Sequence, residues 1–149
     1  MKISKDKSIL LSRCCIVLFA AALLALDGGG YFAARWFCAV RSLDRAALYA
    51  MTAAIYLCSV FAWIALWQLW RLLGNLRREA VFTAENVRRL RIVSWCCVGV
   101  AAVCFAACFF YLPFLFVAIA AGFMALIVRI IKNVFEQAIE MKSELDLTI

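Results

Sequence analysis

Cysteine is the residue type with the most evident capacity for chemistry in this chain, because eight of its 149 residues are cysteines. They are Cys14, Cys15, Cys38, Cys58, Cys96, Cys97, Cys104 and Cys108. Membrane thiol oxidases use C-x-x-C pairs, and this spacing does not occur among the eight. Cys104 and Cys108 are spaced i, i+4, which brings them close on one helical face but rarely permits a disulfide. We therefore expect the cysteines to serve as small apolar side chains. A disulfide from Cys38 to Cys104 or Cys108 would instead favour redox chemistry.

The chain contains no histidine. This absence excludes bis-histidine haem ligation and histidine proton relays. The cysteines also lack the spacing of a zinc knuckle. We therefore expect no catalytic residue, no cofactor and no metal site, and a role other than that of an enzyme. A thiol redox enzyme is the least favoured of the three function classes that we consider.

Charged residues form a second pattern, with basic residues concentrated in the segment 71–91 and acidic residues in the segment 132–149. Glu136, Glu140 and Glu144 recur at the spacing of one helical face. Because their charges are opposite, the two segments could pair with each other or present a docking site for a soluble partner. The candidate docking residues are Phe82, Thr83, Glu85, Asn86, Arg88, Arg89, Arg91, Phe135, Glu136, Glu140, Glu144 and Asp146.

Polar residues inside the apolar stretches are the evidence for or against transport. A transporter retains ionisable residues in the middle of its spans, although each is costly in lipid. We expect none at mid-span here, and we place Asp27 at a span end, where it is a candidate contact for an external ion or ligand. An oligomeric small channel or transporter subunit stays the alternative function, with a pore built from Thr52, Ser59 and Gln68.

Four apolar stretches carry or connect all these residues, and they predict an all-α membrane protein. The spans cover about 9–26, 46–70, 92–112 and 114–131, and about 17 to 25 residues suffice to cross the hydrocarbon layer as a helix. The chain is 68% hydrophobic and its mean hydropathy is +0.99, which excludes an ordinary soluble domain. Long unbroken apolar runs also lack the alternation of a β-barrel. We expect one domain, residues 1–149, with four transmembrane helices in an antiparallel bundle.

Basic residues predict the orientation of this bundle. Thirteen of the 16 Lys and Arg residues lie before or at the start of the first span, in the loop 71–91, or at the end of the fourth span and in the tail after it. The positive-inside rule then places both termini, that loop and that tail in the cytoplasm. The net charge of +7 therefore reflects topology and a contact with the lipid bilayer, and does not indicate direct binding of nucleic acid.

Local signals predict the ends of the helices. The triple glycine Gly28–Gly30 predicts the end of the first span and an external loop on the membrane surface. Thr83 is suited to cap a helix that begins at Ala84 and continues into the third span. Pro113 predicts a tight hairpin between the third and fourth spans. Along the second span, a tryptophan stripe predicts an interfacial anchor or a partner-binding face; it consists of Trp63, Trp67 and Trp70.

Two motifs in the charged segments resemble a known family. The run Phe82 to Arg91 is similar to the F-T-x-E-N-V-x-x-L-R signature of the bacterial domain of unknown function 2975 family. The close of the chain, with Val134-Phe135 and Glu144 to Ile149, is similar to that family's V-F and E-x-D-L-T-I pattern. The resemblance implies a four-span inner-membrane protein with no established chemistry. It also suggests an association with a small helix-turn-helix regulator of the Cro/C1 type.

These observations favour a non-enzymatic membrane protein with a regulatory or interaction role. Its cytoplasmic loop and tail would bind a soluble partner, such as a small DNA-binding regulator held at the membrane. A change in the packing of the helices would alter the affinity for that partner, which requires that the two states bind it differently. A homo-oligomer is compatible with this function and is needed by the channel alternative.

Overall fold

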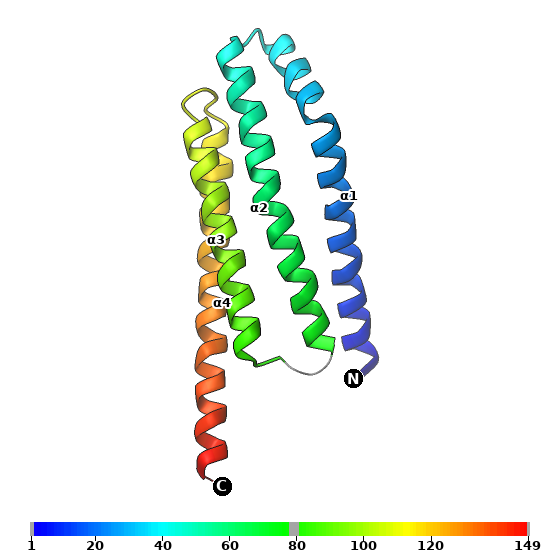
Figure 1. Ribbon diagram of the computed structural model, residues 1–149, viewed down its shortest axis with the longest axis vertical. Coiled ribbons are helices and arrows are strands. Elements are labelled where there is room, and N and C mark those ends of the chain that lie inside the picture. The colour runs from blue at the N-terminus through cyan, green and yellow to red at the C-terminus, as the bar shows by residue number, and fades with distance from the viewer. Residues whose placement is uncertain (1, 78–80, 149) are drawn as a thin grey trace.

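The computed structural model describes residues 2–77 and 81–148, and within them the side chains of residues 7–76 and 81–148. The described chain forms four helices: α1 (Lys2–Arg41), α2 (Arg45–Arg77), α3 (Ala84–Ala107) and α4 (Phe114–Thr148). Consecutive helices run in alternating directions, and the described ends of the chain lie toward the same end of the molecule (Figure 1). The predicted all-helical class is confirmed.

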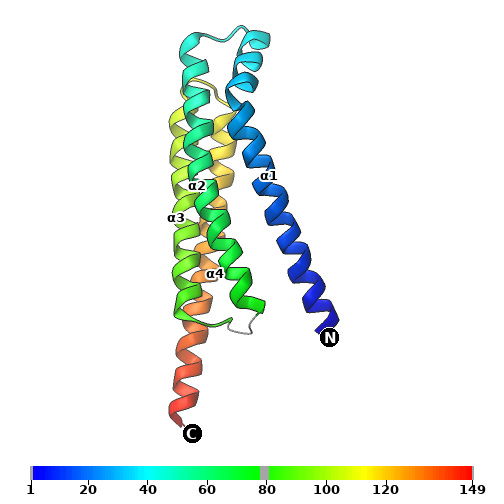
Figure 2. The same ribbon diagram turned by 45° about the vertical axis from the view of Figure 1, so that its right-hand side comes forward.

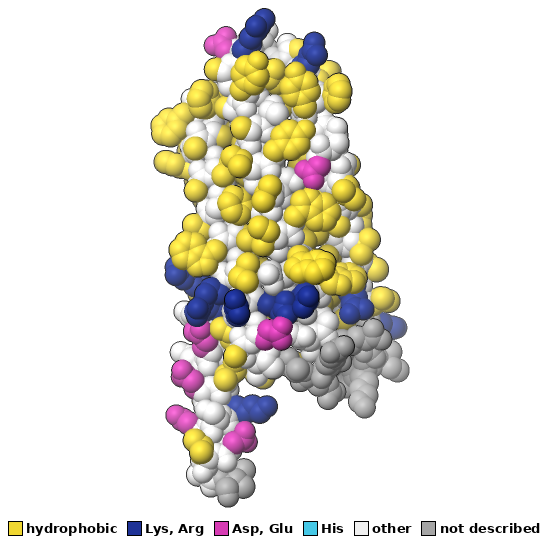
Figure 3. Space-filling model, viewed as in Figure 1, with side chains coloured by type: hydrophobic (Ala, Val, Ile, Leu, Met, Phe, Trp, Pro, Cys, Tyr) yellow, Lys and Arg dark blue, Asp and Glu magenta, His cyan; other side chains and the backbone are white. Residues whose placement is uncertain are grey.

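Each helix is long and apolar enough to cross a membrane, which confirms the prediction of four spans. Many large apolar side chains are exposed on all four helices, as expected for a protein whose solvent is lipid. Figure 3 shows the result as a broad apolar zone along the helices, with Lys and Arg side chains gathered at its two ends. The chain therefore has the features of a multi-pass membrane protein.

The first helix departs from the sequence-based prediction. α1 continues through Gly28–Gly30 to Arg41, so the predicted helix end at this triple glycine is wrong. Inside a membrane, a helix keeps its backbone hydrogen bonds satisfied, and glycine is tolerated there. At Gly30 the absent side chain also permits packing, because a Cβ atom would lie 3.1 Å from Cγ2 of Ile55 on α2. The connection to α2 is short and includes Ser42, whose φ of 51° is left-handed.

The third helix begins as predicted and ends earlier. Thr83 has an extended backbone and its side chain accepts a hydrogen bond from the Asn86 amide, which confirms the cap before Ala84. The helix ends at Ala107 rather than at Leu112, and residues 108–113 form turns that lead into α4. Pro113 explains why no helix passes through this connection, since it disfavours helical backbone in the residue before it.

The helices are arranged as an open row rather than a closed four-helix bundle. Among the described residues, α1 contacts α2, α2 contacts α3 and α3 contacts α4, with no contact between α1 and α4. Figure 1 shows α1 on one side of α2 and the pair formed by α3 and α4 on the other side. Close packing between the inner helices depends on Gly99, where a Cβ atom would lie 2.8 Å from the ring of Phe61. An open row leaves faces of α2, α3 and α4 without a helical neighbour.

Candidate functional site

The basic end of the molecule, where α2 ends and α3 begins, holds most of the residues that we predicted to bind a partner. Figure 3 shows Lys and Arg side chains gathered at this edge of the apolar zone. The cations of this end include Arg13, Arg71, Arg88, Arg89, Arg91, Arg129 and Lys132. α2 extends to Arg77, so much of the predicted loop 71–91 is helical. The middle of this connection, residues 78–80, lies outside the described part of the chain.

Asn86 and Thr83 hold the connection between α2 and α3 in place. The Asn86 side chain is fully buried, with 0% of the residue exposed. Its Oδ1 accepts from Nδ2 of Asn75 on α2 at 2.9 Å, and its Nδ2 donates to the Val81 carbonyl at 2.8 Å. Thr83 and Asn86 were both predicted to be docking residues. Their positions instead give them a supporting role, since Asn86 has no surface to offer and Thr83 caps α3.

Arg89 also points inward, toward α2. Its side chain is 11% exposed and pairs with Glu85 one turn earlier on α3. Its Nη1 donates to Oε1 of Gln68 on α2 at 3.3 Å. A guanidinium held this way joins two helices at the membrane edge, where an unpaired charge would be costly. Glu85 is the more exposed partner of the pair.

Other motif residues join α3 to α4. Arg91 on α3 lies 3.3 Å from Oε1 of Glu136 on α4, and Lys132 lies 3.2 Å from Oε2 of the same carboxylate. The rings of Phe82 and Phe135 are in contact, with their centroids 5.3 Å apart. These contacts confirm that the start of α3 and the later part of α4 lie side by side. The start of α3 and the part of α4 around Phe135 and Glu136 therefore form one continuous surface.

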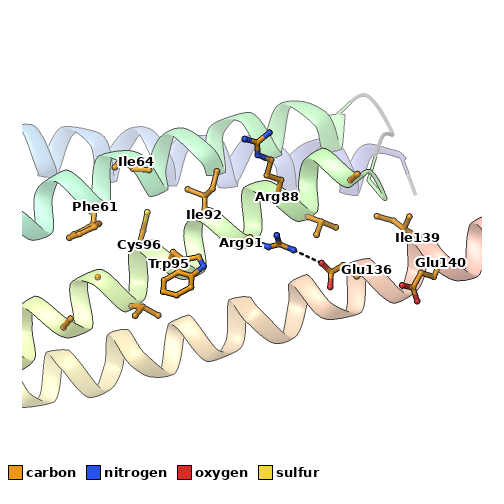
Figure 4. Close-up of a pocket in the computed structure, with 15 residues that line it drawn as sticks. Phe61, Ile64, Arg88, Arg91, Ile92, Trp95, Cys96, Glu136, Ile139 and Glu140 are labelled. Carbon is orange, nitrogen blue, oxygen red and sulfur yellow. Dashed lines mark hydrogen bonds and ion pairs between the residues drawn. The ribbon is translucent and has the colours of Figure 1, made fainter.

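A groove of about 1120 Å³ runs along α3 between α2 and α4 at this surface. Figure 4 shows its two kinds of wall: apolar side chains of α2 and α3 within the membrane zone, and charged side chains toward the basic end. Phe61, Ile64 and Ile92 belong to the first kind, and Arg88 and Glu140 to the second. The groove is present because α2 and α4 do not contact each other. It can hold a ligand or segment that is apolar at one end and charged at the other.

The tail helix extends beyond this groove. α4 continues to Thr148, so the predicted helical extension of the fourth span is confirmed. Figures 1 and 2 show its last turns projecting past the other helices. Residues 140–148 are all exposed, and Leu147 reaches 87%. Glu140 lies at the end of the groove, whereas Glu144 and Asp146 lie beyond it on the exposed end of α4.

Asp27 forms a polar cluster that the sequence analysis missed. It lies well inside α1, not at the end of a span, so the expectation that no ionisable residue occurs at mid-span is wrong. Its carboxylate accepts from the Ser59 hydroxyl and from Nε1 of Trp63, the latter at 2.9 Å. Tyr56 donates to the Asp27 carbonyl at 3.3 Å. Polar groups of α2 at helical spacing were the available signal, because residues 56, 59 and 63 share one face.

The tryptophan stripe of α2 faces α1. Besides the bond from Trp63 to Asp27, the guanidinium of Arg13 on α1 lies 5.3 Å from the Trp70 ring centroid. Arg71 lies 5.6 Å from the ring of Trp67. Cation–π contacts of this kind combine an aromatic anchor with a snorkelling cation at the membrane edge. The stripe therefore contributes to the contact of α1 with α2.

The cysteines are all free thiols. The closest approach between two of them is across α2 and α3, where the Sγ atoms of Cys58 and Cys104 are 3.8 Å apart. Cys38, which we considered as a disulfide partner of Cys104, instead contacts the Met51 sulfur at 3.7 Å. No group of three potential metal ligands occurs among the described residues.

Comparison with known proteins agrees with the two motifs. Residues 9–149 match the model of a family described as "Protein of unknown function (DUF2975)". No curated protein and no solved structure matches the chain.

Proposed function

The chain belongs to the DUF2975 family, and we propose that it is a non-enzymatic membrane protein whose basic end binds a soluble cytoplasmic partner. In this proposal the antiparallel helices span the inner membrane of a bacterium, with both termini in the cytoplasm. The excess of Lys and Arg at one end supports this orientation. The family description itself names no activity.

The projecting end of α4 is the observation that carries the proposal. The end of α4, where every residue from 140 to 148 is exposed, is not stabilised by burial against the other described helices. It combines acidic side chains with exposed Met141, Leu145 and Leu147. Apolar side chains that are exposed outside the membrane zone mark an interaction surface.

The chemistry of this tail favours a basic partner with an apolar patch. Small DNA-binding regulators carry basic surfaces for phosphate contacts, and such a surface complements the carboxylates of Glu140, Glu144 and Asp146. The resemblance to the family suggests a regulator of the helix-turn-helix type. Binding it at the membrane would compete with its binding to DNA.

Charge reversal of the tail tests this proposal. The full-length protein in detergent would be immobilised and offered a purified small helix-turn-helix regulator from the same bacterium. We expect the variant E144K/D146K to lose at least tenfold in affinity for the regulator, because the electrostatic attraction between the acidic tail and a basic partner becomes repulsion. The matched control R35E/R45E alters two charges at the opposite end and should bind normally. Unchanged affinity of the tail variant would refute the proposal.

A second candidate function, ion-coupled transport, has one supporting observation in the cluster around Asp27. An ionisable residue within a span is a functional candidate by default. Its two carboxylate bonds to Ser59 and Trp63 also suit a purely structural role. Proton or sodium flux into vesicles containing the purified protein decides between them. Transport requires a flux above that of empty vesicles that is lost in Asp27→Asn.

A further inference from the structure

A second hollow lies over the seam between α3 and α4 and adjoins the groove beside α2, with which it shares Arg91, Trp95 and Val98. It has a volume of about 280 Å³ and is lined by Arg91, Ser94, Trp95, Val98, Arg129 and Lys132. Three of these six side chains are cations, contributed by two helices. We propose that this seam binds the phosphate of an anionic phospholipid of the surrounding membrane.

The charges at the seam leave a binding capacity for an anion. Glu136 neutralises only part of the cluster, since its single carboxylate contacts both Arg91 and Lys132. Arg129 is exposed and makes no hydrogen bond or ion pair among the described residues. One carboxylate against three cations leaves a net charge of +2. A lipid phosphate placed there would meet charge-assisted donors from two helices.

The position of the seam selects a lipid over a soluble anion. Trp95 is 63% exposed and, with Val98, forms the wall of the hollow that faces the apolar zone. An amphipathic indole beside cations is typical of the headgroup layer, where its ring contacts acyl chains and its N–H faces polar groups. Figure 4 shows Arg91 and Trp95 projecting from α3 on the same side. Basic pockets between membrane helices bind anionic headgroups in this setting.

Lipid retention by the full-length protein in detergent tests the inference. Native mass spectrometry would follow the titration of phosphatidylglycerol, with zwitterionic phosphatidylcholine as the reference. We expect phosphatidylglycerol to bind at least tenfold more tightly, and R129Q/K132Q to lose most of that preference. The matched control R35Q/R45Q removes the same charge at the opposite end and should keep the preference.

Glu136→Gln gives a result of opposite sign. Because Glu136 competes with the phosphate for Arg91 and Lys132, its neutralisation should raise phosphatidylglycerol affinity about fivefold. If these ion pairs only hold α3 and α4 together, Glu136→Gln should not raise the affinity for phosphatidylglycerol. The wild-type lipid preference and this variant decide the matter even if R129Q/K132Q fails to fold.

Three outcomes would overturn the inference. The first is equal affinity for the two lipids, and the second is an equal loss in the control R35Q/R45Q. The third is that added inorganic phosphate binds the seam as tightly as the lipid does, which would identify the ligand as a free phosphate. An increase in lipid binding in Glu136→Gln, with the preference lost in R129Q/K132Q, supports it.

Discussion

At the scale of single residues, Asp27 shows how one polar side chain joins two membrane helices. Its carboxylate receives one donor from Ser59 and one from Trp63, and both belong to α2. Around it, α1 contributes apolar side chains and no contact to α3 or α4. α1 therefore packs chiefly on α2, with a further ring contact between Phe37 and Tyr111 of the connection between α3 and α4, and the Asp27 cluster is its main polar connection.

Replacement of Asp27 should weaken that connection in a graded way. We expect Asp27→Ala to lower the free energy of unfolding by about 1 to 2 kcal/mol, since two donors lose their acceptor. Asp27→Asn should cost less, because its amide oxygen still accepts from Trp63 and the Ser59 hydroxyl can turn to accept from its NH₂ group. Thermal unfolding in detergent measures both changes.

A double-mutant cycle provides the control for this prediction. In the background of Ser59→Ala, the effect of Asp27→Ala should shrink if the two side chains interact directly. Additive effects of the two substitutions would contradict the hydrogen bond between Ser59 and Asp27.

At the scale of helices and their connections, the family motif between α2 and α3 is chiefly a folding device. Thr83 caps α3, Asn86 ties the connection to Asn75, and Phe82 packs on Phe135 of α4. Three helices thus meet at one short segment. The charged residues that follow are exposed only where this framework directs them.

Removal of the buried Asn86 side-chain amide should show how much this connection contributes to the stability of the fold. Asn86→Ala leaves the Asn75 amide and the Val81 carbonyl without a buried partner, and we expect it to cost about 1 to 3 kcal/mol. Asn133→Ala, on the exposed surface of α4, is the matched control and should change the melting temperature little. Equal effects of the two substitutions on the melting temperature would show that the buried hydrogen bonds of Asn86 do not stabilise the connection between α2 and α3.

Glycine packing makes a second prediction at this scale. A Cβ at Gly99 would lie 2.8 Å from the Phe61 ring, so Gly99→Ala should push α2 from α3 and destabilise the protein by about 1 to 3 kcal/mol. Gly122→Ala on α4 meets nothing within 4 Å and should be neutral or slightly stabilising. Phe61→Leu should relieve part of the loss at Gly99. The measurement is again thermal unfolding, and equal effects at the two glycines would contradict the packing of α2 on α3.

The sequence predicted the number of helices well because apolar length is a local property. It also predicted the start of α3, since a threonine before Ala84 has a local capping chemistry. It failed where tertiary packing or lipid decides the outcome. In a water-soluble protein, three successive glycines such as Gly28–Gly30 would be expected to end a helix. The prediction that Asp27 lies at the end of a span depended on that helix end, and α1 continues past it.

The candidate site was predictable in part for the same reason. Opposite charges in the two motifs predicted that they meet, and Arg91 with Glu136 does so. No local pattern shows which motif residues turn inward. Asn86 and Arg89 face α2 because of helix phase and the end of α2, neither of which the sequence alone determines.

At the scale of the whole molecule, the open row of helices gives its two ends different properties. The basic end carries the groove between α2, α3 and α4, the basic seam between α3 and α4, and the projecting acidic end of α4. The opposite end has only short connections, residues 42–44 and 108–113. Since the candidate binding surfaces all lie at the basic end, we expect the protein to bind its partners on one side of the membrane.

Topology decides whether that side is the cytoplasm. We expect an epitope inserted between Leu43 and Asp44 to be accessible to antibody in intact spheroplasts, because the connection from α1 to α2 lies at the end with few cations. An epitope added after Ile149 should become accessible only after lysis, since the chain's C-terminal helix leaves the membrane at the basic end. Protease treatment of spheroplasts, followed by detection of each epitope, checks both positions in one experiment. If the C-terminal epitope is digested in intact spheroplasts while the other is protected, the acidic tail faces away from the cytoplasm. No cytoplasmic DNA-binding regulator could then reach it, and the proposed function would fail although the helices, the groove and the seam would stay as they are.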